Sequence, residues 1–148
     1  FDGPLALSGA IANGRAVLAA RAMGADFGYV GSAFIATREA HASDDYKASI
    51  VASGAQDIVY TNLFTGVHGN YLRASIERAG LDPENLPESD PSKMSFASEK
   101  TKAWRDIWGS GQGIGAIDHV PPAGELVARL AREYDDALRA LSSDPVAP

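Results

Sequence analysis

The chain of 148 residues contains no cysteine and has neither a long apolar run nor an excess of basic residues. Without thiols it has no disulfide framework, no thiolate nucleophile and no cysteine-based zinc site. The apolar runs are all too short to predict a membrane-spanning helix. The formal net charge of −6 argues against the basic face that nucleic-acid-binding domains present. We therefore expect a cytoplasmic protein with no nucleic-acid or membrane partner.

The N-terminal residues also lack an initiating methionine and the basic-then-apolar pattern of a signal peptide. Residues 1–4 lead directly into an apolar segment. The chain is well short of the ~250 residues of a complete α/β barrel. These features predict a chain that is entered in the middle of a fold. The alternative is a small domain released by processing.

Two apolar runs, each followed by a helical pattern, come first in the chain. Residues 5–7 form the first run, and Asn13 is the expected N-cap of a helix that ends near Gly24. Residues 27–30 form the second run, which leads into another helical segment. Apolar runs that alternate with helices are typical of buried parallel strands in βαβ units. The sequence therefore predicts an α/β fold.

The remainder of the chain is predicted to be mainly helical. Ser43 is expected to cap one helix, and residues 57–61 are expected to form a short strand. Further helices are predicted over residues 69–79 and around residues 104–108. The prolines at 121–122 are expected to open a last helix, since proline is tolerated in a first turn. Its apolar stripe comprises Leu126, Leu130, Tyr134, Leu138 and Leu141.

Each of the two predicted strands ends in a turn of small residues, at 8–10 and at 29–32. A turn between a parallel strand and a helix aims backbone N–H groups at one point, where phosphate binds without a charged side chain. Glycine allows the main chain to approach closely, and Ser8 or Ser32 can add a hydroxyl. In (β/α)₈ barrels the loops after strands seven and eight frequently form such a site. The alternative is that the glycines only permit tight turns.

Three stretches resemble, in order, the last two βα units of the nitronate monooxygenase family. Residues 8–15 read SGAIANGR, residues 22–26 read AMGAD and residues 30–39 read VGSAFIATRE. The family pattern is approximately GGIADGR, ALGAD and QMGTRFxATxE. The resemblance extends over nearly the whole chain and is weakest over residues 81–95. Shorter matches occur at residues 46–47, 64–66 and 111–113.

The resemblance implies the C-terminal part of an FMN-binding (β/α)₈ TIM barrel, completed by the N-terminal half of the same barrel. Residues 1–42 would hold the last two βα units, and residues 43–148 a helical C-terminal or lid region. The implied activity is the FMN-dependent oxidation of a small molecule, an alkyl nitronate, with O₂. Two alternatives remain open: an NAD(P)H-dependent flavin reductase acting on a quinone or enoyl thioester, and a non-catalytic flavin-binding fragment. The isolated chain is expected to be inactive.

The same resemblance implies that the two turns contact FMN, mainly its phosphate, through backbone amides. The chain departs from the family at Ala10, where a second glycine is usual, at Tyr29, which replaces glutamine, and at Ser32, which replaces threonine. Gln112, in a glycine-rich segment, is a further candidate donor at the flavin edge. The candidate cofactor-binding residues are Ser8, Gly9, Ala10, Tyr29, Val30, Gly31, Ser32 and Gln112.

No catalytic residue is assigned. The family's proton-abstracting histidine is expected in a GGHxG segment upstream of the first turn, and this chain contains no such segment. We expect His41 to be solvated, His119 to lie in a loop, and His68 to be the one histidine that can line a pocket mouth. Residues 44–45 are better explained as acidic residues at a helix N-terminus than as metal ligands.

Overall fold

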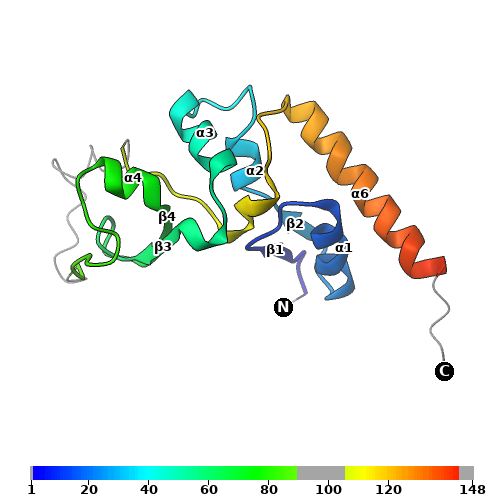
Figure 1. Ribbon diagram of the computed structural model, residues 1–148. Coiled ribbons are helices and arrows are strands. Elements are labelled where there is room, and N and C mark those ends of the chain that lie inside the picture. The colour runs from blue at the N-terminus through cyan, green and yellow to red at the C-terminus, as the bar shows by residue number, and fades with distance from the viewer. Residues whose placement is uncertain (1, 90–105, 144–148) are drawn as a thin grey trace.

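The computed structural model describes residues 2–89 and 106–143, which form two small sheets with helices packed around them (Figure 1). Strands β1 (Ala6–Ser8) and β2 (Phe27–Tyr29) are parallel, and helix α1 (Gly14–Ala22) connects them. This is the βαβ arrangement predicted from the sequence, and the α/β class is confirmed.

Local sequence signals set the limits of α1. The Asn13 side chain accepts a hydrogen bond of 2.9 Å from the Ala16 N–H and caps the first turn, as predicted. Gly24, which follows the helix, has a φ of +94°, a conformation that costs glycine little. The helix buries Ala20 against Ile11 and Ala25 in a small apolar cluster. The sequence pattern is therefore sufficient to place this element.

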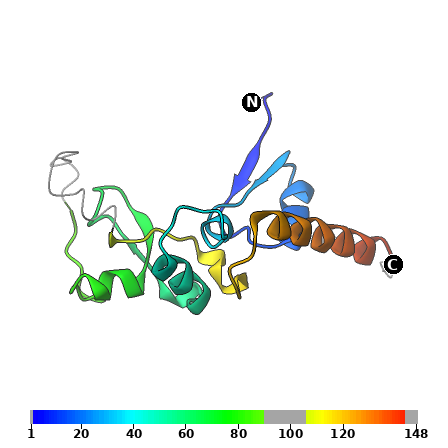
Figure 2. The ribbon, with the colours of Figure 1, turned by 90° about the horizontal axis from the view of Figure 1, so that it is seen from above.

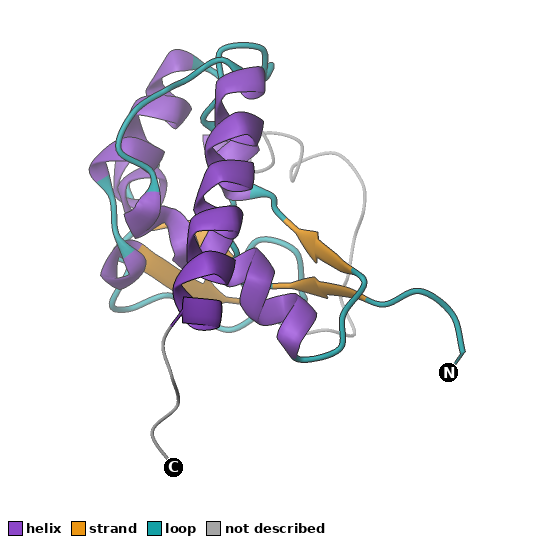
Figure 3. Cartoon of the chain, turned by 90° about the vertical axis from the view of Figure 1, so that its right-hand side faces the viewer, coloured by secondary structure: helices purple, strands orange, loops and turns teal. Residues whose placement is uncertain are grey.

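The β1–β2 sheet is covered on one face only. Leu7 and Gly28 pair in the middle of the sheet and face α1. The side chains that alternate with them point away, and Phe27 and Tyr29 are 62% and 65% exposed. In Figure 3 the two strands project beyond the helices on the side of the N-terminus. The chain therefore presents an uncovered, partly aromatic sheet face.

A long insertion separates β2 from the last helix. In Figures 1 and 2 it extends to the far side of the molecule from the β1–β2 pair, with α2, α3 and η3 between the two sheets. Its elements are α2 (Ser32–Ile35), α3 (Asp44–Ala52), η1 (Ala55–Asp57), β3 (Ile58–Thr61), β4 (Gly69–Leu72), α4 (Arg73–Arg78) and η3 (Gln112–Ala116).

The insertion contains a β-hairpin where the sequence predicts mostly helix. The strand expected over residues 57–61 is confirmed as β3, but the helix predicted over residues 69–79 is wrong for its first four residues. These form β4, which pairs antiparallel with β3 and sets Leu72 opposite Ile58. Cross-strand pairing determines the conformation of this segment, and the helical spacing of its apolar residues does not reveal that pairing. Helix α4 therefore begins only at Arg73.

The helix predicted around residues 104–108 ends earlier than expected, because Asp106 is helical but the residues after it are not. Trp104 lies outside the described residues, and Ile107 and Trp108 are not helical. Trp108 instead runs beside β4, because its carbonyl accepts a hydrogen bond of 2.8 Å from the Leu72 N–H. The Ser110 N–H likewise donates to the Asn70 carbonyl at 3.1 Å. This pairing gives the segment an extended conformation.

The main core joins the insertion to the last helix. Ile50 of α3, Leu72 of β4 and Ile114 of η3 are fully buried in one cluster with Trp108 and Leu126. Ser43 caps α3 by accepting a hydrogen bond from the Tyr46 N–H, as predicted. Helix α2, which follows the second candidate turn, is anchored in this cluster through Ala33, whereas β1 and α1 pack in the separate cluster around Ile11.

Helix α6 (Ala123–Ser143) returns from the insertion to pack along α1 (Figure 1). Its first N–H group, on Ala123, donates to the Glu39 carboxylate at 2.8 Å. The Gly14 N–H donates to Glu133 Oε2 at 2.8 Å, which ties α1 to the middle of α6. The predicted apolar stripe docks through its first half, since Leu126 is buried whereas Leu141 is 70% exposed. No helix in the described ranges is long and apolar enough to cross a bilayer.

Candidate functional site

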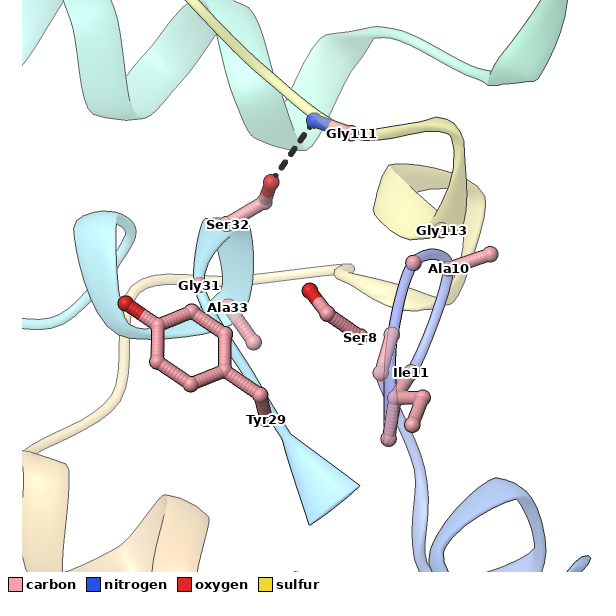
Figure 4. A pocket seen from close by; sticks show the side chains of 11 residues that line it. Ser8, Ala10, Ile11, Tyr29, Gly31, Ser32, Ala33, Gly111 and Gly113 are labelled. Carbon is pink, nitrogen blue, oxygen red and sulfur yellow. Dashed lines mark hydrogen bonds between the residues drawn. The ribbon is translucent and has the colours of Figure 1, made fainter. Parts of the chain in front are cut away.

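The turns after β1 and β2 meet a third loop around a cavity of about 210 Å³ (Figure 4). The third loop, residues 111–113, leads into η3 on the return path from the insertion. Three segments that lie far apart in the sequence therefore enclose one space. Its walls are formed by Ser8, Gly9, Ala10, Ile11, Ala12, Tyr29, Gly31, Ser32, Ala33, Gly111 and Gly113.

The first turn has an unusual backbone. Gly9 has a φ of +106° and Ala10 a φ of +54°, and Ala10 is the one non-glycine residue with a positive φ in the described ranges. The left-handed conformation crowds a Cβ atom, so it is uncommon for alanine. Gly113 packs directly on this turn, because a Cβ there would lie 2.8 Å from the Ala10 carbonyl oxygen. The third loop thus holds the turn in a strained shape, as is common at functional sites.

Replacing Ala10 with glycine is expected to preserve the fold and to raise the free energy of unfolding by up to about 1 kcal/mol. The left-handed strain is relieved, and the greater freedom of glycine in the unfolded chain offsets part of the gain. Replacement with valine is expected to lower it by about 2 kcal/mol, since branching at Cβ aggravates the strain. Urea unfolding of the two variants measures the difference. Equal stabilities for the glycine and valine variants would contradict the backbone assignment.

The second turn offers unpaired hydrogen-bond donors. Gly31 precedes α2, and no side chain caps that helix. In the described part of the chain, no backbone carbonyl accepts from the N–H groups of Ser32 or Ala33. A Cβ built on Gly31, or on Gly9 across the cavity, would meet no atom within 4 Å. The missing side chains leave an open space bordered by N–H donors, which suits an anionic group.

Ser32 connects the second turn to the third loop. Its Oγ accepts a hydrogen bond of 2.8 Å from the Gly111 N–H (Figure 4). The hydroxyl hydrogen is not used in this bond and can still donate to a ligand. Ser32 therefore lines the cavity and also holds the third loop against the second turn.

Replacing Ser32 with alanine is expected to lower the free energy of unfolding by about 1 kcal/mol, because the Gly111 N–H loses its acceptor. Replacement with threonine keeps the hydroxyl and is expected to have little effect. Hydrogen exchange at the Gly111 amide reports the bond directly. Unchanged exchange in the alanine variant would show that Ser32 does not hold the third loop.

None of the described residues in the cavity wall has a charged side chain. The polar groups of the wall are backbone amides, two serine hydroxyls and the Tyr29 phenol, and its apolar side includes the buried Ile11. Tyr29 stands at the opening with most of its ring exposed. An anion bound here would be held by neutral donors alone, and its recognition would depend on the backbone geometry of the turns.

A family model described as nitronate monooxygenase matches residues 2–133. The chain belongs to the nitronate monooxygenase family. It is 29% identical to the nitronate monooxygenase of Paraburkholderia phytofirmans, with 93% of this chain and 40% of that protein covered. It is 30% identical to nitronate monooxygenase npaC of Metarhizium robertsii, with 97% of this chain and 44% of that protein covered. The chain thus spans less than half the length of these relatives.

Two solved structures share the fold. The nitroalkane oxidase of Streptomyces ansochromogenes superposes with a TM-score of 0.73 at 30% identity, over 95% of this chain and 42% of that one. FabK of Thermotoga maritima superposes with a TM-score of 0.71 at 23% identity, over 96% of this chain and 47% of that one. The βαβ unit and the insertion therefore occur together in longer proteins.

The structure brings six of the eight candidate residues of this family member to one cavity. The two others lie elsewhere: Val30 packs in the apolar core, and Gln112 begins η3 without joining the cavity wall. The glycines on either side of Gln112 line the cavity instead. The close approach of Gly113 to the first turn is the reason a small residue is needed there. The six residues are Ser8, Gly9, Ala10, Tyr29, Gly31 and Ser32.

No histidine lines this cavity. His68 stacks on the Tyr60 ring, with centroids 4.9 Å apart, on the β3–β4 hairpin. His119 lies 2.6 Å from the Asp118 carboxylate, and this hydrogen bond lowers the pKa of Asp118. His41 lines a separate cavity. Within the described ranges, no cluster of side chains has the composition of a metal site.

Proposed function

We propose that this chain is the C-terminal part of an FMN-dependent (β/α)₈-barrel oxidoreductase that oxidises alkyl nitronates with O₂. The observation that carries the proposal is the cavity between the two βα turns, in which the N–H groups of Ser32 and Ala33 have no acceptor. Family membership supports a flavin as the group that these turns hold. Successive βα turns are also the place where barrels commonly bind phosphate.

The residues present fit the phosphate end of FMN. The absent side chains of Gly9 and Gly31 leave space for phosphate oxygens, and the serine hydroxyls add donors. The cavity of about 210 Å³ is smaller than a typical site for a whole cofactor, so we assign it to the phosphate end alone.

When bound, the flavin supplies the redox chemistry, and the described residues hold and orient it. The Ser32 hydroxyl would donate to the phosphate, while its oxygen accepts from the Gly111 N–H and keeps the third loop in place. Ile11 excludes water from the apolar side of the cavity. None of the described residues that line the cavity can act as a general base, so proton abstraction from the substrate is assigned to a histidine outside this chain.

The remaining strands of the barrel are assigned to the uncovered face of the β1–β2 sheet. Phe27 and Tyr29 are both largely exposed there, and a parallel pair is normally buried on both faces. The relatives are more than twice as long as the matched segment, which provides the residues for such a partner.

Oxygen consumption by the full-length protein tests the proposal. The FMN-loaded protein is expected to consume O₂ with propyl-2-nitronate and to show no NADH oxidation above the rate of free FMN. NADH oxidation with a quinone and no turnover of the nitronate would replace the proposal with a flavin reductase. FMN binding without turnover of either substrate would leave a non-catalytic flavoprotein.

A further inference from the structure

A second cavity of about 490 Å³ lies on the insertion, between the start of α3 and the segment that runs beside β4. Its volume falls within the usual range for small-molecule sites. None of its lining residues belongs to the cavity between the two βα turns, which is called the phosphate cavity below. The lining residues are His41, Ala42, Ser43, Tyr46, Tyr71, Ile107, Trp108 and Gly109.

Stacked aromatic rings form the main wall of this second cavity. The rings of Tyr46 and Trp108 are nearly parallel, with an interplanar angle of 10° and centroids 4.9 Å apart. The Arg78 guanidinium lies 3.9 Å from the Trp108 ring and also reaches Asp45 at 3.3 Å. Trp108 is only 6% exposed and packs against both the Tyr46 ring and the Arg78 guanidinium. The wall is therefore flat, aromatic and held in place before any ligand arrives.

The polar groups of the second cavity are few and mainly neutral. The Tyr46 hydroxyl donates to the Gly109 carbonyl, and burial raises the pKa of this hydroxyl. The Ser43 hydroxyl is used to cap α3. Among the described residues that line the cavity there is no carboxylate, lysine or arginine, and His41 is the one imidazole. A ligand with a full charge would find no counter-ion here.

The loop of the phosphate cavity also reaches the second cavity. Gly109 lines the second cavity and accepts from Tyr46, and two residues later Gly111 lines the phosphate cavity and donates to Ser32. Ser110 between them is buried. The two cavities therefore share one short loop, whose backbone is hydrogen-bonded to Tyr46 at Gly109 and to Ser32 at Gly111.

We propose that the second cavity binds a planar, uncharged aromatic ring of an organic ligand, stacked against the Tyr46 ring, which Trp108 supports from its other side. The flat wall provides stacking area, and the single imidazole provides one hydrogen bond to a carbonyl or similar acceptor on the ring. Its position along the same loop makes the second cavity a chamber next to the cofactor. That role, but not the binding itself, rests on the proposed function.

The test uses 4-fluorobenzamide as the probe and the full-length protein. Binding is followed by the ¹⁹F line width of the probe and by the ¹⁵N–¹H signal of the Trp108 indole. We expect the indole signal to shift with 4-fluorobenzamide and to remain unchanged with cyclohexanecarboxamide, which is similar in size but not planar. Equal responses to both compounds, or none to either, would overturn the proposal.

Substitutions in the second cavity show where 4-fluorobenzamide binds. Tyr46→Leu is expected to weaken binding about tenfold or more, whereas the matched Tyr60→Leu, on the exposed hairpin, is expected to leave it within about twofold. Ala42→Trp fills the cavity without removing a contact and is expected to abolish binding even if Tyr46→Leu proves too unstable to test. Undiminished binding in Ala42→Trp would place the probe elsewhere and refute the site.

The measurement is made with and without bound FMN, which separates this inference from the proposed function. Probe binding by a protein that has no affinity for FMN would preserve the second cavity and remove the proposed cofactor. FMN binding without any probe response would do the reverse.

Discussion

Replacing Gly14 with alanine is expected to lower the free energy of unfolding by about 3 kcal/mol, the largest stability effect of the substitutions considered. A Cβ on Gly14 would lie 2.2 Å from the Leu130 carbonyl oxygen and 2.3 Å from the Tyr134 nitrogen. Both atoms belong to the backbone of α6, so no side-chain rotation can relieve the clash. Helix α1 must move away from α6, and the hydrogen bond from the Gly14 N–H to Glu133 is lost with it.

Urea unfolding of the full-length protein measures this effect, and Gly124→Ala is the matched control. Gly124 lies in the first turn of α6, and a Cβ there meets no atom within 4 Å. Alanine is a better helix former than glycine, so the control is expected to be neutral or stabilising by up to about 1 kcal/mol. Equal stabilities for the two variants would contradict the close packing of α1 on α6.

Replacing Gly31 with aspartate is expected to lower the affinity for FMN by about 100-fold or more while leaving the fold intact. Aspartate is a favourable N-cap residue, so α2 loses nothing. A side chain at this position projects into open space beside the unpaired N–H groups of Ser32 and Ala33. Its carboxylate would occupy the proposed phosphate position and repel the phosphate charge. Fluorescence titration of FMN gives the affinity.

Gly31→Asn is the matched variant, because it has the same shape without the charge. Its loss of affinity is expected to be clearly smaller than that of Gly31→Asp, and both proteins are expected to unfold at the wild-type urea concentration. Undiminished FMN binding by Gly31→Asp would remove the second turn from the cofactor site.

Short-range signals were enough to predict the βαβ unit and its turns. Asn13 caps α1 and Ser43 caps α3 as expected, because a cap depends on a side chain and a backbone group only three residues apart. Gly9 and Gly31 mark the ends of β1 and β2 for a similarly local reason. The pairing of the two strands then brings both turns to one edge of the sheet.

The misplaced elements depend on contacts distant in sequence. The β4 strand exists because its residues pair with β3 on one side and with the segment around Trp108 on the other. The strand β3 was predicted, but neither pairing is visible in the local pattern, and the spacing of Tyr71, Leu72 and Ile76 also fits a helix. The glycine-rich segment around Gln112 was expected at the flavin edge, but its packing on the first turn was not foreseen, since Gly113 reaches Ala10 only after the chain returns from the insertion.

The return of α6 to α1 is a further feature that the pattern left open. The apolar stripe from Leu126 to Leu141 predicts that the helix docks, but it does not identify the surface. The identifying residues are Gly14 and Glu133, a glycine without a side chain and a carboxylate that accepts its N–H. Their complementarity is apparent only when the two helices are placed together.

Isothermal titration of the full-length protein with FMN and with riboflavin tests the central claim most directly. The two ligands share the ring system and differ by the phosphate, which is the group assigned to the cavity between the βα turns. FMN is expected to bind about 100-fold more tightly than riboflavin, the margin expected for a well-held phosphate. Equal affinities, or no affinity for either ligand, would contradict the claim.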